Sequence, residues 1–439
     1  MKKSTLDATN ENIWKSIRDN TFNRNTDICD FISLLERMEG NFYISLDADW
    51  GSGKTFFVRQ VEEALKFCNK YSFDMESVSS LPSYEYLKDC LPLKSIQLQR
   101  SYLPVYYNAW LYDSHHDPLL SLISIIIKIC AGVFDTKLDS VSLKSGIVSL
   151  LQSASQVIKE PSLALTTASA GALLSSSVVD ILDSIQTEDE IRETIREIFN
   201  EAISEHADRL VVFIDELDRC RPTFAVEMLE KIKHYFSDDR IIFVVSTNKE
   251  QLSHTIKRFY GDEFDATRYL NKFFDLNIGL PEIKYPLPLP AENQYWLTSI
   301  TNELLSYYNF SLRDILIVLD KISSISHFAI YDSSNIGYRI YSLFVPIIIV
   351  LDMQDIQKYK NFLSGKSNIL DELFNNIDHL QNFAKDFDLS NNRNVEKGVE
   401  EIKKAYLDVF SPKKSLNQSN MLGIPNNAKD ICLSIYRSI

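Results

Sequence analysis

Gly51-Ser52-Gly53-Lys54-Thr55 stands between an apolar run at 42–46 and a helical pattern at 56–61. This order of strand, glycine-rich turn and helix suits a phosphate cradle, because glycines let backbone N–H groups close on phosphate oxygens. The amino end of the following helix adds the positive end of its dipole. The stretch therefore predicts a nucleotide-binding loop and, around it, an α/β fold.

Two side chains carry the chemistry expected at this turn. Lys54 can reach the β- and γ-phosphates, and Thr55 can offer its hydroxyl to Mg²⁺. The full pattern places a glycine at position 48, where this chain has Ala48. Alanine there costs roughly 1–2 kcal/mol if φ is positive, and little if φ is negative. The predicted nucleotide-binding residues are Trp50, Gly51, Ser52, Gly53, Lys54, Thr55 and Phe56, with packing as the alternative role for Trp50.

A second apolar run, 209–214, ends in Asp215-Glu216. P-loop enzymes hold Mg²⁺ with a carboxylate at the tip of a strand beside the phosphate loop, so Asp215 is predicted on the metal side together with Thr55. Glu216 points differently and is predicted to orient or activate water against the γ-phosphate. The alternative is an acidic strand end that caps the next helix.

A third run, 241–245, ends in Ser246-Thr247-Asn248. A polar side chain at this strand tip can sense the γ-phosphate, and Asn248 is the candidate. A simple turn or helix-cap role for Asn248 is the alternative.

Composition limits the classes of function. The 439 residues are 45% hydrophobic and 24% charged, which is typical of a globular protein. The net charge of −14 argues against broad binding of nucleic acid or anionic membrane. Six widely spaced cysteines without a CxxC pair and the polar residues after Met1-Lys2-Lys3 predict a reduced, cytoplasmic protein.

Strands alternating with helices predict a parallel α/β sheet. The prolines of 281–290 mark the best domain boundary, and the pattern beyond them is helical. We expect an N-terminal helical segment at 1–40, an NTPase core at 41–117 and 208–280, a helical insertion at 118–207, a linker at 281–292 and a helical lid or C-terminal domain at 293–439.

Two stretches raise the question of a membrane span. Residues 162–179 are uncharged but only mildly apolar, and 119–134 are short and contain Lys128. A spanning helix needs about 17–25 strongly apolar residues. Both stretches are therefore interpreted as buried helices, and membrane contact is not favoured.

Four separated stretches share a pattern with one known family. They are Asp49–Thr55, Tyr107–Trp110, Ile214–Pro222 and Tyr269–Phe274. Together they resemble the KAP family of P-loop NTPases over about residues 20–350. The resemblance implies an additional-strand P-loop fold, ATP as the nucleotide, and a long helical insertion that often carries membrane spans.

The resemblance also bears on single residues. Glu216 stands where the family often has a second Asp, which keeps a carboxylate. Asp218 and Arg219 match the family motif but could equally form an ion pair with each other. Arg268, just before the last motif, is a candidate arginine finger for a neighbouring subunit, which would imply a homo-oligomer. Arg313 opens a stretch that resembles the sensor helix of AAA+ lids, with a solvated arginine at a helix start as the alternative.

These observations predict an ATPase that uses ATP and Mg²⁺. By resemblance alone, hydrolysis drives or times a conformational change in a bacterial antiphage or plasmid defence complex with partner proteins. The alternatives are a nucleotide-gated interaction module with little turnover and a membrane-side scaffold.

Overall fold

The computed structural model describes residues 8–73, 78–114, 117–133, 207–283, 287, 295–326, 336–387 and 392–411. The chain divides between Glu282 and Ile283 into two compact units. Of the predicted insertion at 118–207, helix α7 (Pro118–Val133) is described and 134–206 lie outside the described residues.

The first unit contains a five-stranded sheet in which every pairing is parallel. The strands are β1 (Phe42–Asp47), β2 (Tyr102–Asn108), β3 (Arg209–Asp215), β4 (Ile241–Thr247) and β5 (Leu276–Gly279). Their order across the sheet is β2-β3-β4-β1-β5. Strand β4 thus lies between the phosphate-loop strand β1 and the acidic strand β3, which confirms the additional-strand P-loop fold.

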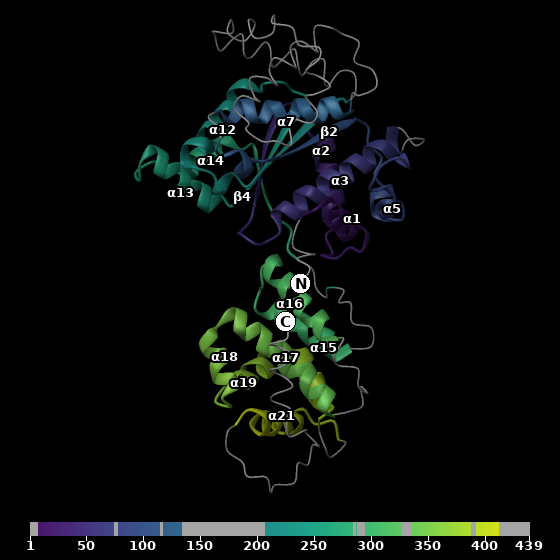
Figure 1. Cartoon of the computed structure of the whole chain (residues 1–439), viewed down its shortest axis with the longest axis vertical. Helices are drawn as coiled ribbons and strands as arrows, with labels where there is room; N and C mark the ends of the chain where they lie inside the picture. The colour runs from purple at the N-terminus through teal and green to yellow at the C-terminus, as the bar shows by residue number, and fades with distance from the viewer. Residues whose placement is uncertain are drawn as a thin grey trace, which may run out of the picture. The chain divides into compact units, whose positions relative to one another are not determined.

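Helices cover both faces of this sheet, so its central strands are continuous apolar runs, as is usual for parallel strands. All seven residues of β3 and of β4 are buried. Helices α7 and α12 lie on one side and α3 on the other (Figure 1). Tyr107 of β2 fixes α7 through a hydroxyl contact of 2.6 Å with Ser121, and Phe57 of α3 packs edge-on against Phe31 of α2. The helices of this unit, besides α7, are α1 (Asn10–Arg18), α2 (Asn25–Arg37), α3 (Lys54–Phe73), α5 (Tyr84–Leu87), α6 (Leu91–Lys94), α12 (Pro222–Tyr235), α13 (Lys249–Tyr260) and α14 (Ala266–Phe273).

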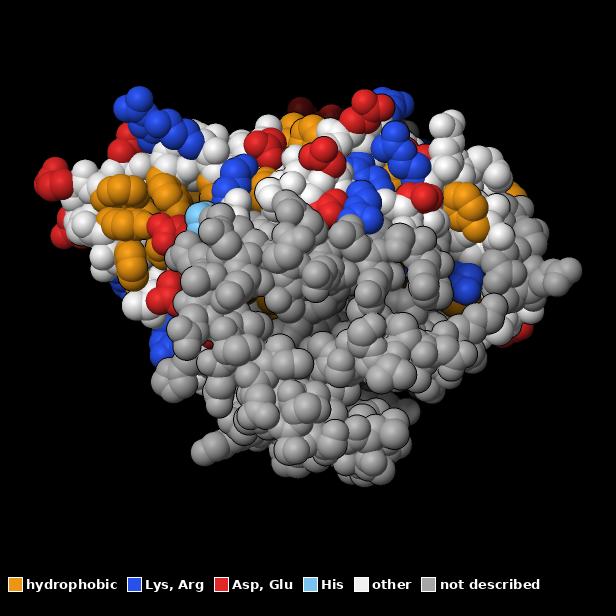
Figure 2. Space-filling model, turned by 90° about the horizontal axis from the view of Figure 1, so that it is seen from above, with side chains coloured by type: hydrophobic (Ala, Val, Ile, Leu, Met, Phe, Trp, Pro, Cys, Tyr) orange, Lys and Arg blue, Asp and Glu red, His pale blue; other side chains and the backbone are white. Residues whose placement is uncertain are grey.

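Aromatic side chains gather at the end of α13. The ring of Tyr260 stacks on Phe264 with 4.4 Å between centroids and meets Phe259 edge-on at 4.8 Å. Phe259 and Tyr260 are both exposed. Figure 2 shows hydrophobic side chains gathered at the left, the side on which Figure 1 places α13. The far end of this helix therefore carries an apolar surface.

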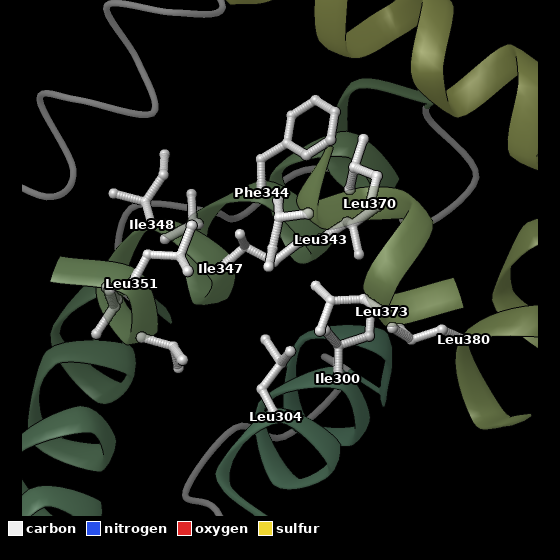
Figure 3. Packing of buried hydrophobic residues seen from close by; sticks show 14 of the residues in the cluster. Ile300, Leu304, Leu343, Phe344, Ile347, Ile348, Leu351, Leu370, Leu373 and Leu380 are labelled. Atoms are coloured by element: carbon white, nitrogen blue, oxygen red, sulfur yellow. The ribbon is translucent and has the colours of Figure 1, made fainter. Parts of the chain in front are cut away.

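The second unit is helical around its own core. Its described helices are α15 (Tyr295–Tyr307), α16 (Leu312–Ser326), α17 (Ile336–Gln354), α18 (Ile356–Leu363), α19 (Ile369–Asn376), α20 (Asp378–Lys385) and α21 (Val395–Phe410). Helix α17 is apolar all round and forms the centre, because every residue from Leu343 to Leu351 except Pro346 is part of the buried cluster. Figure 3 shows its side chains meeting Ile300 and Leu304 of α15 and Leu373 of α19.

Helices α20 and α21 approach each other very closely at Gly398. A Cβ atom built at this glycine would lie 1.9 Å from the carbonyl oxygen of Ala384. Real Cβ contacts are never this short, so the crossing of the two helices requires glycine at this position.

Across the described parts of the chain, no helix combines the length and the hydropathy that a membrane span needs, and residues 162–179 fall outside those parts.

Candidate functional site

The loop at 48–53 joins β1 to α3 and has the glycine geometry that the sequence predicts. Gly51 and Gly53 have φ values of 84° and 93°, a region that residues with a Cβ rarely adopt. Ala48 is not among the residues with positive φ. Its amide donates to Thr247 of β4 at 3.2 Å, so it extends the sheet. Alanine therefore fits position 48 without backbone strain, which answers the question left open by the sequence.

Lys54 is the first residue of α3 and is only 9% exposed. Its Nζ donates to the carbonyl oxygens of Ala48 at 2.6 Å and Asp49 at 3.0 Å. Burial lowers the pKa of Lys54, and nearby carboxylates, led by Asp218 and Asp215, oppose the shift. The ammonium group thus lies against the loop and within the field of the acidic strand tip.

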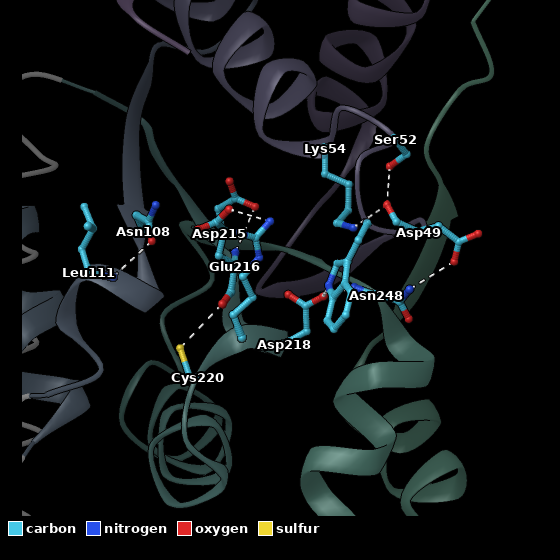
Figure 4. A network of polar contacts seen from close by, with 12 residues as sticks. Asp49, Ser52, Lys54, Asn108, Leu111, Asp215, Glu216, Asp218, Cys220 and Asn248 are labelled. Atoms are coloured by element: carbon cyan, nitrogen blue, oxygen red, sulfur yellow. Dashed lines mark hydrogen bonds and ion pairs between the residues drawn. The ribbon is translucent and has the colours of Figure 1, made fainter. Parts of the chain in front are cut away.

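Asp215 ends β3 and is buried. Its Oδ2 accepts from the hydroxyl of Tyr106 at 3.1 Å, and its Oδ1 accepts from the amide of Glu216 at 3.0 Å. Burial raises the pKa of Asp215, and a hydrogen bond from the Thr55 hydroxyl is the strongest opposing effect. Thr55 and Asp215, predicted as a pair from positions 160 residues apart, are therefore in contact. Figure 4 shows Asp215 and Lys54 at the same end of the sheet.

The donor set fits Mg²⁺ only with help from phosphate. Within the described ranges, no group of three or more His, Cys, Asp or Glu residues could hold a metal ion by itself. Mg²⁺ is usually bound by one or two carboxylates together with substrate phosphates and water. Thr55 and Asp215 supply the hydroxyl and carboxylate oxygens that such a site takes from the protein.

Glu216 follows the last residue of β3 and turns the chain away from the sheet. Its φ of 60° and ψ of 27° are left-handed, which is uncommon for a residue with a side chain. Its Oε1 lies 3.1 Å from Nη2 of Arg219. Burial and then Asp215 raise the pKa of Glu216, whereas Arg219 and a hydrogen bond from Asn108 lower it. The carboxylate is therefore paired with two neighbours.

Asp218 organises the opposite side of the site. Its Oδ2 accepts from the indole Nε1 of Trp50 at 2.7 Å and from the amide of Asn248 at 3.0 Å. The side chain of Asn248 caps α13 through Gln251 N at 3.0 Å and donates to Oδ1 of Asp49 at 3.1 Å. Figure 4 shows this chain of contacts linking the loop with the tips of β3 and β4.

Comparison with known proteins now identifies the family. A family model described as the KAP family P-loop domain matches residues 26–287, more than half of the chain.

The chain belongs to the KAP family of P-loop NTPases.

Comparisons with solved structures and with curated proteins do not extend the assignment of this KAP protein beyond its family. A solved structure of C. elegans PCH-2 aligns at 10% identity over 90% of this chain and 72% of that chain. Its TM-score of 0.23 is too low to carry an argument. No curated protein matches. The resemblance stated from the sequence is confirmed, and P-loop NTPase families generally bind nucleotide with Mg²⁺.

Four further predicted residues of this KAP protein are Trp50, Phe56, Arg268 and Arg313. Trp50 is 52% exposed, and its indole donates to Asp218. Phe56 packs edge-on against Phe22. Arg268 is exposed on α14, and Arg313 lies on α16 in the second unit. The roles of Arg268 and Arg313 stay predictions.

Sequence reasoning missed several partners in this KAP site. It treated Asp218 and Arg219 as a possible ion pair, but Arg219 pairs with Glu216. The sequence pattern gives no role to Tyr106, whose hydroxyl donates to Asp215. Tyr106 and Asn108 both belong to β2, which pairs with β3 in a register that sets Asn108 opposite Asp215.

Proposed function

We propose that this KAP protein binds ATP with Mg²⁺ and hydrolyses it. The observation that carries the proposal is the convergence of Lys54, Thr55 and Asp215 at one edge of the parallel sheet. A buried ammonium, a hydroxyl and a buried carboxylate are the groups that a triphosphate and its cation require from a protein. These groups come from two distant motifs, so a chance match in one motif does not account for them.

Each residue has a role in this proposal. Residues 50–56 cradle the phosphates, and Lys54 neutralises charge that develops on the γ-phosphate. Thr55 and Asp215 would hold Mg²⁺, which when bound would supply positive charge to offset the charge on the phosphates. Glu216 orients water and accepts its proton, and Asn248 orients the same water. Arg268, from a second copy, and Arg313, from the second unit, would complete the charge compensation.

The wider role rests on the family resemblance alone. Hydrolysis would drive or time a conformational change in a cytoplasmic antiphage or plasmid defence complex with partner proteins. Phage plating on cells carrying the wild-type system or its Lys54→Ala variant tests this role. Equal plating on both would reject it.

A second candidate function has one observation in its favour. Glu216 is engaged by Arg219 and Asn108, so protein groups take part of the hydrogen-bonding capacity that the proposed base needs for water. A nucleotide-gated interaction module that holds ATP and turns it over very slowly would have such a site. Glu216 would then be released only when a partner binds.

Two measurements on the purified chain separate these functions. Calorimetry with ATP, with and without Mg²⁺, measures binding, and steady-state phosphate release measures turnover. Binding with turnover supports the enzyme, and Mg²⁺-dependent binding without turnover supports the gated module. No binding by the wild-type chain rejects both. Lys54→Ala is the control and should abolish the binding signal.

A further inference from the structure

One buried arginine near the phosphate loop has no role in the mechanism above. Arg24 precedes α2 and is only 3% exposed. Two residues of the turn before it, Asn20 and Asn23, have φ values of 47° and 52°. Asparagine tolerates this left-handed conformation better than most residues, so the turn suits the sequence and carries Arg24 inward.

The guanidinium of Arg24 is only partly satisfied. Its Nη2 donates to the carbonyl oxygen of Pro281 at 2.6 Å and, more weakly, to that of Ser52 at 3.4 Å. Its Nε and Nη1 are shielded from solvent and meet no hydrogen-bond partner among the described residues. Buried polar groups are nearly always paired, and each exception needs an explanation. Burial also lowers the pKa of Arg24 to about 10.

The sheet order shows which part of a nucleotide would come to Arg24. The carboxylates proposed for Mg²⁺ and water lie at the tip of β3, on the β4 side of β1. We infer that a triphosphate with its γ-phosphate there extends its nucleoside in the opposite direction, toward β5. Pro281 lies on that side, because the preceding residue, Leu280, donates its amide to Asp47 of β1 at 2.9 Å. Arg24 contacts the phosphate loop from this same side.

We propose that Arg24 is a specificity-determining residue that donates hydrogen bonds from Nε and Nη1 to acceptor atoms on the ribose or base of the bound nucleotide. The proposal rests on the proposed function, since it assumes that a nucleoside triphosphate occupies the loop. Arginine has five N–H donors and no acceptor, so it reads carbonyl oxygens, ring nitrogens and hydroxyl oxygens. The carbonyl contacts of Nη2 fix the guanidinium and leave Nε and Nη1 as its two unpaired donors.

Comparing ATP with inorganic tripolyphosphate tests this assignment, because tripolyphosphate has the phosphates and lacks the nucleoside. Calorimetry in Mg²⁺ would be run on the full chain, wild type and Arg24→Ala. We expect Arg24→Ala to weaken ATP about 10–100-fold, the value of one or two hydrogen bonds to a charged group, and to change tripolyphosphate by less than about twofold. Equal weakening of both ligands, or no weakening of ATP, would overturn the proposal.

Arg209 provides a matched control. It is as buried as Arg24, at 3% exposure, but it is the first residue of β3 and so lies at the amino-terminal end of the strands, away from the phosphate loop. It donates to the backbone oxygens of Met38, Gly40 and Asp239. Arg209→Ala should lower stability and leave the ratio of the two affinities at the wild-type value. A changed ratio in Arg209→Ala would show that general loosening explains the effect, and would overturn the assignment of Arg24.

A measurement on the wild type keeps the proposal testable if Arg24→Ala does not fold. ATP should slow amide hydrogen exchange at residues 21–25, and tripolyphosphate at saturation should not. Equal protection by both ligands would overturn the proposal. If the wild type binds tripolyphosphate and ATP equally well, the Arg24 contact fails while the phosphate site stands. If it binds neither, the proposed function itself fails.

Discussion

Replacing Glu216 with Gln removes one negative charge from the tip of β3 and keeps the size of the side chain. The substitution should have a small effect on stability and a large effect on turnover. The ion pair with Arg219 spans 3.1 Å, and the side chains of Glu216 and Arg219 are 15% and 38% exposed. A partly exposed ion pair contributes about 0–1 kcal/mol to stability, so Glu216→Gln should lower the free energy of unfolding by about that amount at most.

The effect of Glu216→Gln on turnover should be much larger. A positioned general base contributes typically about 10²–10⁴-fold, which corresponds to about 3–5 kcal/mol of the activation barrier. Gly53, Lys54 and Thr55 are untouched, so the affinity for Mg-ATP should stay close to that of the wild type. The variant should therefore fold, bind and fail to hydrolyse.

Steady-state phosphate release and calorimetry with Mg-ATP measure the two quantities, and thermal denaturation checks the fold. Glu250→Gln is a suitable control, because Glu250 is an exposed carboxylate in the first turn of α13. Wild-type turnover in Glu216→Gln would refute the reasoning that this carboxylate prepares water. A wild type without turnover that still binds Mg-ATP would favour the gated module.

Three other variants test separate parts of the structure. Tyr106→Phe removes the hydroxyl that donates to Asp215, and should raise the Mg²⁺ concentration for half-maximal phosphate release about tenfold; an unchanged Mg²⁺ requirement would contradict this. Burial lowers the pKa of Lys54 below 10.5 in the folded chain. The charged Lys54 therefore lowers the free energy of unfolding at pH values below its folded pKa, and this destabilisation fades as pH rises toward 10.5. Denaturant unfolding should therefore show wild type gaining stability relative to Lys54→Met as pH rises through that window, and a pH-independent difference would exclude the buried charge as its cause. Gly398→Ala places a Cβ against the Ala384 carbonyl and should destabilise the second unit by about 1–3 kcal/mol in thermal denaturation, whereas an unchanged transition would mean that the helices separate freely.

Local patterns predicted the parts of the fold that depend on short stretches. The runs at 42–46, 209–214 and 241–245 became β1, β3 and β4, because fully buried parallel strands need continuous apolar residues. The edge strand β5 was missed. It has four residues with alternating intermediate and exposed positions, and such a segment lacks an apolar signal of its own.

The site divides in the same way. The meeting of Thr55 with Asp215 followed from motif spacing and the family pattern. The position of Arg24 depends on a contact with Pro281, 257 residues away, that no local pattern encodes. The side chain of Asn248 serves as a helix cap, the alternative kept open from the sequence, and its role toward the γ-phosphate remains a prediction.

The side chain of Asn248 connects the phosphate loop with helix α13. Asn248 caps α13 with its oxygen and holds Asp49 of the phosphate loop with its nitrogen. Helix α13 has 12 residues and is about 18 Å long, and its far end bears the exposed rings of Phe259 and Tyr260. A displacement of Asp49 would therefore act directly on the residue that caps α13. Binding at the loop could in this way be transmitted along α13 to an aromatic surface that lies a full helix length from the phosphate loop.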